Sequence, residues 1–200
     1  RQALIDHLLA QDWNVFGTLK FVNGRTIGRS SADKLLRSYW NRIDRMFFGK
    51  AAERQNMRVP RWCFAHEGSD SENYHIHFAL QAPIPDVDHM CCMLNAVWAQ
   101  HHNQTAPLFK NWIMPVTDRT AVASYLTREY WRLGSDTFLD AVSWDDRAAA
   151  NAFKDYHHLK QANRLSRAAS PFWLRHAQQA LNDQKAAYQA NADQFVMERG

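Results

Sequence analysis

Two runs of β-forming residues, only six residues apart, constrain the fold of this 200-residue chain more than any other feature. The first run is 59–67 (VPRWCFAHE) and the second is 74–80 (YHIHFAL). The segment between them, 68–73, is polar and contains glycine, serine and asparagine, the residue types that favour turns. The pattern therefore predicts an antiparallel hairpin.

Further strands and helices are predicted on both sides of this hairpin. We expect strands at 14–22 and 112–116, and helices at 31–48, 86–101 and 119–132. Strands that alternate with hairpins and helices in this order pack in layers. The sequence therefore predicts an α+β domain with an antiparallel sheet and flanking helices.

Residues 134–200 show only helical signals. The segment 144–167 is rich in alanine and predicts one helix. Ser170-Pro171 suits the N-cap and first position of a second helix that runs towards Phe195. We therefore divide the chain into a domain at 1–133 and a helical extension at 134–200, packed on that domain or following it.

The composition is that of a globular protein, with 46% hydrophobic and 22% charged residues. No apolar run approaches the about 20 residues of a membrane span, so we expect no membrane partner. The three cysteines, Cys63, Cys91 and Cys92, are odd in number and two are adjacent, which predicts reduced thiols in a cytoplasmic protein. The net charge of +4 is concentrated in residues 1–70 and suits phosphate binding, with a merely solvated surface as the alternative.

A candidate metal site lies in the second strand of the hairpin, at His75-Ile76-His77. Side chains alternate along a strand, so the two imidazoles point to one face, ~7 Å apart, and can bind one divalent ion. A lone His-x-His pattern is weak evidence, because it also arises by chance.

A third ligand would strengthen this interpretation. Glu67 ends the preceding strand, and the hairpin is expected to bring it beside the histidines. A carboxylate with two imidazoles suits Mg²⁺ or Mn²⁺. His66 alternates to the other side of its strand and is interpreted as structural, and Asp70 in the turn is a weaker candidate ligand.

A candidate nucleophile lies on the helix predicted at 119–132. Tyr125 and Arg128 are three positions apart and share a face of that helix. A tyrosine hydroxyl can attack phosphorus and form a covalent link, and an arginine can hold the phosphate. Tyr130 lies about 140° further around the helix and is the alternative nucleophile. Without the histidine pair, a core aromatic would be the simpler interpretation of Tyr125.

Together these segments resemble the three motifs of the HUH superfamily of endonucleases, in particular the rolling-circle replication initiators with one catalytic tyrosine. Residues 16–21 (FGTLKF) resemble the first motif, 74–78 (YHIHF) the His-hydrophobic-His motif and 124–128 (SYLTR) the Tyr-x-x-Lys motif. The resemblance covers roughly residues 13–132. Arg128 replaces the family lysine, which keeps the charge but makes proton transfer doubtful.

The resemblance implies a ferredoxin/RRM-like sheet of about five strands, with Glu67 as the third metal ligand and Tyr125 on a helix across from it. It implies nicking and joining of single-stranded DNA through a 5′-phosphotyrosine, which initiates replication of a phage, plasmid or other mobile element in a bacterial cytoplasm. Host polymerase and helicase are the implied partners. The basic residues that would follow the DNA backbone are Lys20, Arg25, Arg29, Lys34 and Arg37.

Three other functions remain open at this point. A single-tyrosine transposase or relaxase-like nuclease shares the chemistry, although the relaxase tyrosine usually precedes the histidines, whereas Tyr125 follows them. A catalytically silent DNA-binding module would keep the fold and lose the reaction. An unrelated metal-dependent hydrolase would use water and form no covalent adduct. The oligomeric state is also open.

Overall fold

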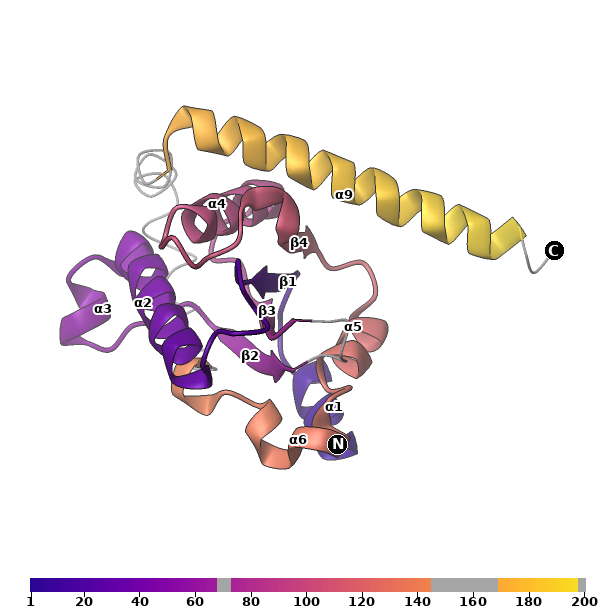
Figure 1. The fold of residues 1–200 in the computed structure, drawn as a ribbon, viewed down its shortest axis with the longest axis horizontal. Coiled ribbons are helices and arrows are strands. Elements are labelled where there is room, and N and C mark those ends of the chain that lie inside the picture. Colours follow the sequence, from indigo (N-terminus) through magenta and orange to yellow (C-terminus); the bar gives the residue numbers. More distant parts are fainter. Residues whose placement is uncertain (68–72, 145–168, 198–200) are drawn as a thin grey trace.

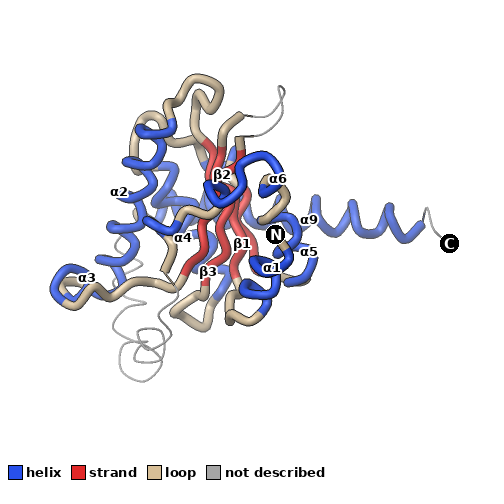
Figure 2. Tube along the Cα trace, turned by 90° about the horizontal axis from the view of Figure 1, so that it is seen from below, coloured by secondary structure: helices blue, strands red, loops and turns tan. Residues whose placement is uncertain are grey.

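A computed structural model, which describes residues 1–67, 73–144 and 169–197, contains one sheet with helices on both of its faces (Figure 2). The sheet has four strands in the order β2-β3-β1-β4, and all neighbours are antiparallel. The protein is therefore α+β, as the sequence predicts. The strands are β1 (Val15–Lys20), β2 (Arg61–His66), β3 (His75–Leu80) and β4 (Trp112–Pro115).

The helices follow the expected order, with two additional short ones that the sequence did not predict, at the N-terminus and directly after the first long helix. Asp86 caps the helix that follows it, because its side chain accepts a hydrogen bond from the His89 amide. No helix in the described part of the chain is long and apolar enough to cross a membrane. The helices are α1 (Gln2–Leu9), α2 (Arg29–Phe48), α3 (Ala51–Arg54), α4 (Val87–Ala99), α5 (Arg119–Leu126), α6 (Tyr130–Leu133) and α9 (Pro171–Met197), with 3-10 turns η1 (Leu108–Lys110), η2 (Gly134–Thr137) and η3 (Asp140–Val142).

The two faces of the sheet are covered differently. Helices α2 and α4 lie over one face, which we call the helix-covered face, and bury Trp40 and Phe78 in the main core (Figure 2). On the other face, which we call the histidine face, α1 and α5 cover only one half. A second apolar cluster that includes Leu8, Trp62 and Phe64 fills that half. The other half of this face carries the candidate site.

The expected count of about five strands is not confirmed, since the sheet has four strands among the described residues. Where a fifth strand would flank β2, the chain after Gly134 forms the turns η2 and η3 instead. This segment pairs with β2 only through two isolated bridges, Arg61↔Trp144 and Phe64↔Phe138. The backbone N–H and C=O groups at the outer edge of β2 therefore bond to irregular backbone and not to a further strand.

The single helix expected at 119–132 is also wrong, because α5 ends at Leu126 and α6 begins at Tyr130. Thr127 lies at the break and is buried. Its hydroxyl donates to the carbonyls of Ala123 and Ser124, and such bonds compete with regular helix geometry.

The C-terminal helix α9 begins where Ser170-Pro171 predicts it. It packs against α4 and β4, and its C-terminal end extends away from the sheet (Figure 1). The helix expected at 144–167 lies outside the described residues, except for Trp144.

Candidate functional site

The register of the sheet brings three histidines together on the histidine face. His66 lies directly opposite His75, and His77 is two residues further along β3. Residues opposite each other in an antiparallel pair point to the same face. One ligand atom from each ring lies within 4.8 Å of the others, and all three residues are buried.

The placement of His66 on the other face was therefore wrong. It was based on the apolar residues Trp62 and Phe64, which share the face of His66. That face is apolar in one half because α1 and α5 cover it, and it becomes polar where this cover ends. Apolar neighbours along β2 therefore did not exclude His66 from the site.

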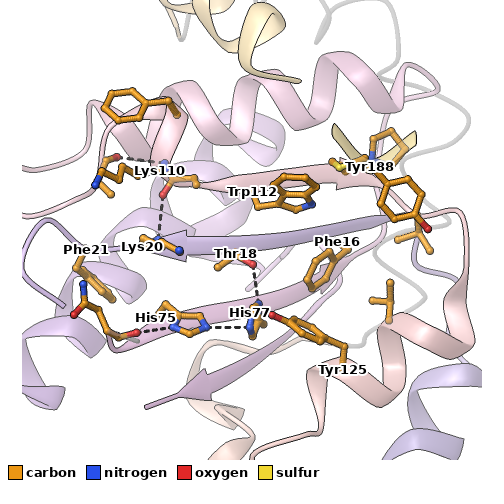
Figure 3. Close-up of a pocket in the computed structure, with 18 of the residues that line it drawn as sticks. Phe16, Thr18, Lys20, Phe21, His75, His77, Lys110, Trp112, Tyr125 and Tyr188 are labelled. Atoms are coloured by element: carbon orange, nitrogen blue, oxygen red, sulfur yellow. Dashed lines mark hydrogen bonds between the residues drawn. The ribbon is translucent and has the colours of Figure 1, made fainter. Parts of the chain in front are cut away.

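Each imidazole is held by an oxygen atom through one of its ring nitrogens. Figure 3 shows these bonds for His75 and His77. Carbonyl oxygens only accept hydrogen bonds, so the opposite nitrogens of His75 and His66 carry lone pairs. Metal-binding histidines in proteins are oriented in the same way. The bonds join His75 Nδ1 to the Asn73 carbonyl (2.6 Å), His77 Nδ1 to the Thr18 hydroxyl (2.8 Å) and His66 Nε2 to the Leu126 carbonyl (3.1 Å).

The remaining nitrogens face one another. A hydrogen bond of 3.1 Å joins His75 Nε2 and His77 Nε2, and a bound cation would have to replace its proton. Burial, with a smaller contribution from the positive charge of Arg128, lowers the pKa of His66 to about 3. Burial also holds the pKa of His77 well below its ordinary value. Neutral imidazoles are the form that binds a metal ion.

Glu67 lies outside this group. It is exposed and follows the last residue of β2, where alternation turns it away from His66. Its charge acts instead on Tyr74, whose pKa is raised to about 12, mainly by burial and then by Asp33 and Glu67. His66 occupies the place expected for Glu67, and Asp70 lies outside the described residues.

Tyr125 lies beside the histidines at the edge of an open groove. Its ring centroid is 4.8 Å from that of His77, and its hydroxyl end points towards His77 (Figure 3). The side chain is 40% exposed, so Tyr125 is not a core aromatic. Helix α5 holds it there, since Ala123 and Leu126 anchor the opposite side of that helix in the second apolar cluster.

Arg128 contacts both parts of the site. Its guanidinium carbon lies 4.5 Å from the ring centroid of Tyr125. Its Nε donates to His66 Nδ1 at 3.3 Å, the nitrogen that a cation would need. Tyr130 lies beyond the helix break, and no ring contact joins it to the histidines within the described part of the chain.

The groove extends from the histidines across β1 and β4 and has a volume of about 1010 Å³. Exposed aromatic rings and lysines on its walls suit unstacked bases and phosphates. Phe109 is 75% exposed, and Tyr188 of α9 is 46% exposed. These two residues were missed because they lie outside every motif, and only the Phe109-Lys110 pair carries any sequence signal. The aromatic and basic residues that line the groove are Phe16, Lys20, Phe21, Phe109, Lys110, Trp112, Tyr125 and Tyr188.

Of the five basic residues expected to follow DNA, only Lys20 lines this groove. Arg25 is exposed in the loop after β1, and Arg29 donates to the Asp136 carbonyl. Lys34 and Arg37 lie on the outer surface of α2, across the sheet from the histidines.

No family model, curated protein or solved structure matches the chain. The arrangement of side chains therefore provides the basis for a functional assignment.

Proposed function

We propose that the chain is an HUH-type endonuclease that nicks single-stranded DNA and joins itself to the new 5′ end through Tyr125. The supporting observation is that the half-exposed ring of Tyr125 lies 4.8 Å from the ring of His77, within a group of three buried histidines. The proposal includes the ferredoxin/RRM-like arrangement of that superfamily, here with four strands.

The donor set fits a divalent cation. His66, His75 and His77 would hold it through three neutral nitrogens. Three imidazoles without a carboxylate favour Mn²⁺ over Mg²⁺, since Mg²⁺ prefers oxygen ligands. When bound, such a cation supplies Lewis-acid polarisation of a phosphate.

Tyr125 is the nucleophile in this proposal. Its phenol oxygen forms a bond to phosphorus, and the bond from phosphorus to the 3′ oxygen of the preceding nucleotide breaks. The phenol proton leaves to solvent, and the departing 3′ oxygen takes up a proton. The products are a 5′-phosphotyrosine and a 3′ hydroxyl, which can later reverse the reaction and reseal the strand.

Arg128 is the phosphate-binding residue. A guanidinium pairs with phosphate oxygens in a bidentate manner and does not lose its proton. In the structure it donates to His66 Nδ1. It must leave that nitrogen when the imidazole binds a cation, which makes the guanidinium available to a phosphate.

The groove would hold the single strand that leads to Tyr125. Trp112 and Phe16 lie on the histidine face, opposite Thr18 and Met114, where unpaired bases can stack. Lys20 and Lys110 would contact its phosphates. We place the reaction in rolling-circle replication of a mobile element, with host polymerase and helicase as partners. An obligate dimer would favour a transposase instead.

The test uses a pool of single-stranded DNA oligonucleotides labelled at the 3′ end, because the adduct retains the segment downstream of the nick. With Mn²⁺, the wild type should give a slower protein–DNA band on a denaturing gel. Tyr125→Phe should abolish that band, and Tyr130→Phe is the matched control that should keep it. A chelator, His75→Ala or His77→Ala should also abolish it.

Three results would overturn parts of the proposal. An adduct that persists in Tyr125→Phe and is lost in Tyr130→Phe reassigns the nucleophile. Cleavage without any adduct indicates a hydrolase in which water attacks. DNA binding without cleavage or adduct indicates a silent DNA-binding module.

A further inference from the structure

The outer surface of α2 carries a basic hollow of about 840 Å³. Four cationic side chains line it, and none of its described lining residues is acidic. Because α2 covers the helix-covered face, this hollow lies on the other side of the sheet from the histidines (Figure 2). The four residues, which we call the α2 basic surface, are Lys34, Arg37, Arg42 and Arg45.

The spacing of these residues produces one continuous stripe. Lys34 and Arg37, like Arg42 and Arg45, are three positions apart and lie side by side on the helix. Lys34 and Arg45 are separated by about three full turns, or about 16 Å at the helical rise of about 1.5 Å per residue. Ser38 and Asn41 fill the positions between the charges. Like charges at this spacing repel one another, so the stripe does not serve the stability of α2.

Internal ion pairs do not neutralise most of the stripe. Arg45 pairs with Glu53 of α3. Lys34, Arg37 and Arg42 form no ion pair with any residue in the ranges that the structure describes. Among the described residues, three cations are therefore without an ion pair, and Arg37 also lines a neighbouring hollow that contains Asp33 and Asp136.

We propose that the α2 basic surface binds the phosphate backbone of duplex DNA. Guanidinium groups match phosphate oxygens. No aromatic ring other than His101 lines the hollow, so it lacks the stacking surfaces of the groove that suit unpaired bases. Met46 is the only apolar residue that lines it, which is too little for insertion into a lipid surface.

The length of the stripe also suits a duplex. A major groove is about 12 Å wide, so a stripe of about 16 Å can contact phosphates on both of its sides. These contacts would carry no sequence information. The choice of DNA over RNA rests on the proposed function.

Duplex and single strand would then bind on opposite sides of one sheet. The loop 21–28, which carries Arg25, connects the Lys20 end of β1 to the first residue of α2. The substrate would be a single-stranded segment that adjoins a duplex, such as a hairpin stem or melted origin. The α2 basic surface would hold the duplex part.

The experiment measures affinity for a short fluorescent DNA duplex of arbitrary sequence over a series of salt concentrations. The variant is Lys34→Ala/Arg37→Ala/Arg42→Ala. The matched control is Lys50→Ala/Arg54→Ala/Arg175→Ala, which removes three exposed cations elsewhere and leaves the same net charge. Lys34→Glu alone, at an exposed position, is the second variant in case the triple variant does not fold.

The triple variant should bind the duplex about tenfold or more weakly, and the slope of log affinity against log salt should fall by about 3, about 1 for each phosphate contact. The control should bind like the wild type. Equal loss in both variants would show a general effect of net charge and overturn the inference. Loss confined to single-stranded DNA, to duplex RNA or to anionic vesicles would also overturn it.

Tyr125→Phe, measured in parallel, separates this inference from the proposed function. It should bind the duplex normally and form no adduct. If the wild type forms no adduct but the triple variant loses duplex binding, the nicking proposal fails and the duplex surface stands. If adduct formation behaves as proposed and the triple variant binds the duplex normally, only the duplex surface is wrong.

Discussion

The two faces of the sheet bury polar atoms in different ways. On the helix-covered face, the carboxylate of Asp44 accepts bonds from Arg61 Nη1 (2.7 Å), Arg61 Nη2 (3.0 Å) and the Val59 amide (2.9 Å). On the histidine face, His75 Nε2 and His77 Nε2 face each other at 3.1 Å. The first arrangement satisfies its own groups and supports the fold. In the second, the facing ring nitrogens bond one another and Arg128, and a cation could replace those bonds.

The largest expected loss of stability comes from a substitution on the helix-covered face. Asp44→Ala leaves Arg61 buried without its carboxylate, because both side chains are almost fully inaccessible. We expect a loss of about 3–5 kcal/mol in the free energy of unfolding, measured by denaturant titration. Glu53→Ala is the control, since its pair with Arg45 is exposed and should contribute at most about 1 kcal/mol. A similar small loss in both variants would contradict the distinction.

The next largest expected effect is the stabilisation of the protein by a cation bound at the histidine face. Mn²⁺ at a hundredfold excess over its dissociation constant should stabilise the wild type by about 2.7 kcal/mol, and chelation should reverse this. His77→Ala should show no response to Mn²⁺ in thermal unfolding. His176→Ala, an exposed histidine on α9, should respond like the wild type. An undiminished response in His77→Ala would place the cation elsewhere.

The sequence predicts local alternation well and strand register poorly. His75 and His77 were placed on one face because the side-chain period of a strand is two. The placement of His66 and Glu67 needed the register of β2 against β3, and a shift of one residue exchanges the two. The pairing of β2 with β3 in the folded protein sets that register. The predicted positions of His66 and Glu67 were therefore both wrong for the same reason.

Other parts of the structure also depended on distant contacts. The helix breaks after Leu126, where the buried hydroxyl of Thr127 bonds the Ala123 carbonyl. Among the described residues, turns and isolated bridges occupy the edge of β2. Tyr188 reaches the groove only because α9 packs back on α4 and β4. Hydrophobic periodicity predicts each helix or strand separately. It therefore predicts the elements that carry the site residues, but not that these residues lie close together.

A smaller effect tests the packing of the helix-covered face without touching the histidines. A Cβ at Gly17 would lie 2.3 Å from the ring of Phe78, its partner on β3. Gly17→Ala should therefore cost about 1–3 kcal/mol of stability and leave the Mn²⁺ response intact. At Gly28 an added Cβ meets nothing within 4 Å, so Gly28→Ala should stay within about 0.5 kcal/mol. If Gly17→Ala removed the Mn²⁺ response, the two faces would not be independent.

The last substitution, Thr18→Val, removes a single hydrogen bond. The Thr18 hydroxyl lies 2.8 Å from His77 Nδ1 and can accept the ring N–H, which leaves the lone pair of Nε2 towards the other histidines. Valine has a similar shape but leaves Nδ1 of the buried His77 without its partner, so the metal-free protein should lose about 1–2 kcal/mol. Mn²⁺ affinity should fall about 10- to 100-fold, as measured by competition with a metal indicator.

Thr18→Ser is the matched control, because it keeps the hydroxyl and should restore the affinity. If valine bound Mn²⁺ as tightly as threonine, the hydroxyl would not orient His77 towards a cation. The 2.8 Å contact would then only satisfy buried polar atoms, as the bonds of Asp44 do on the helix-covered face. Only His66 and His75 would then remain as residues oriented for a cation. Thr18→Val replaces the hydroxyl with a methyl group and hardly changes the volume of the side chain. A loss of Mn²⁺ affinity in this variant alone would therefore be due to the orientation of the His77 ring and not to the packing around it.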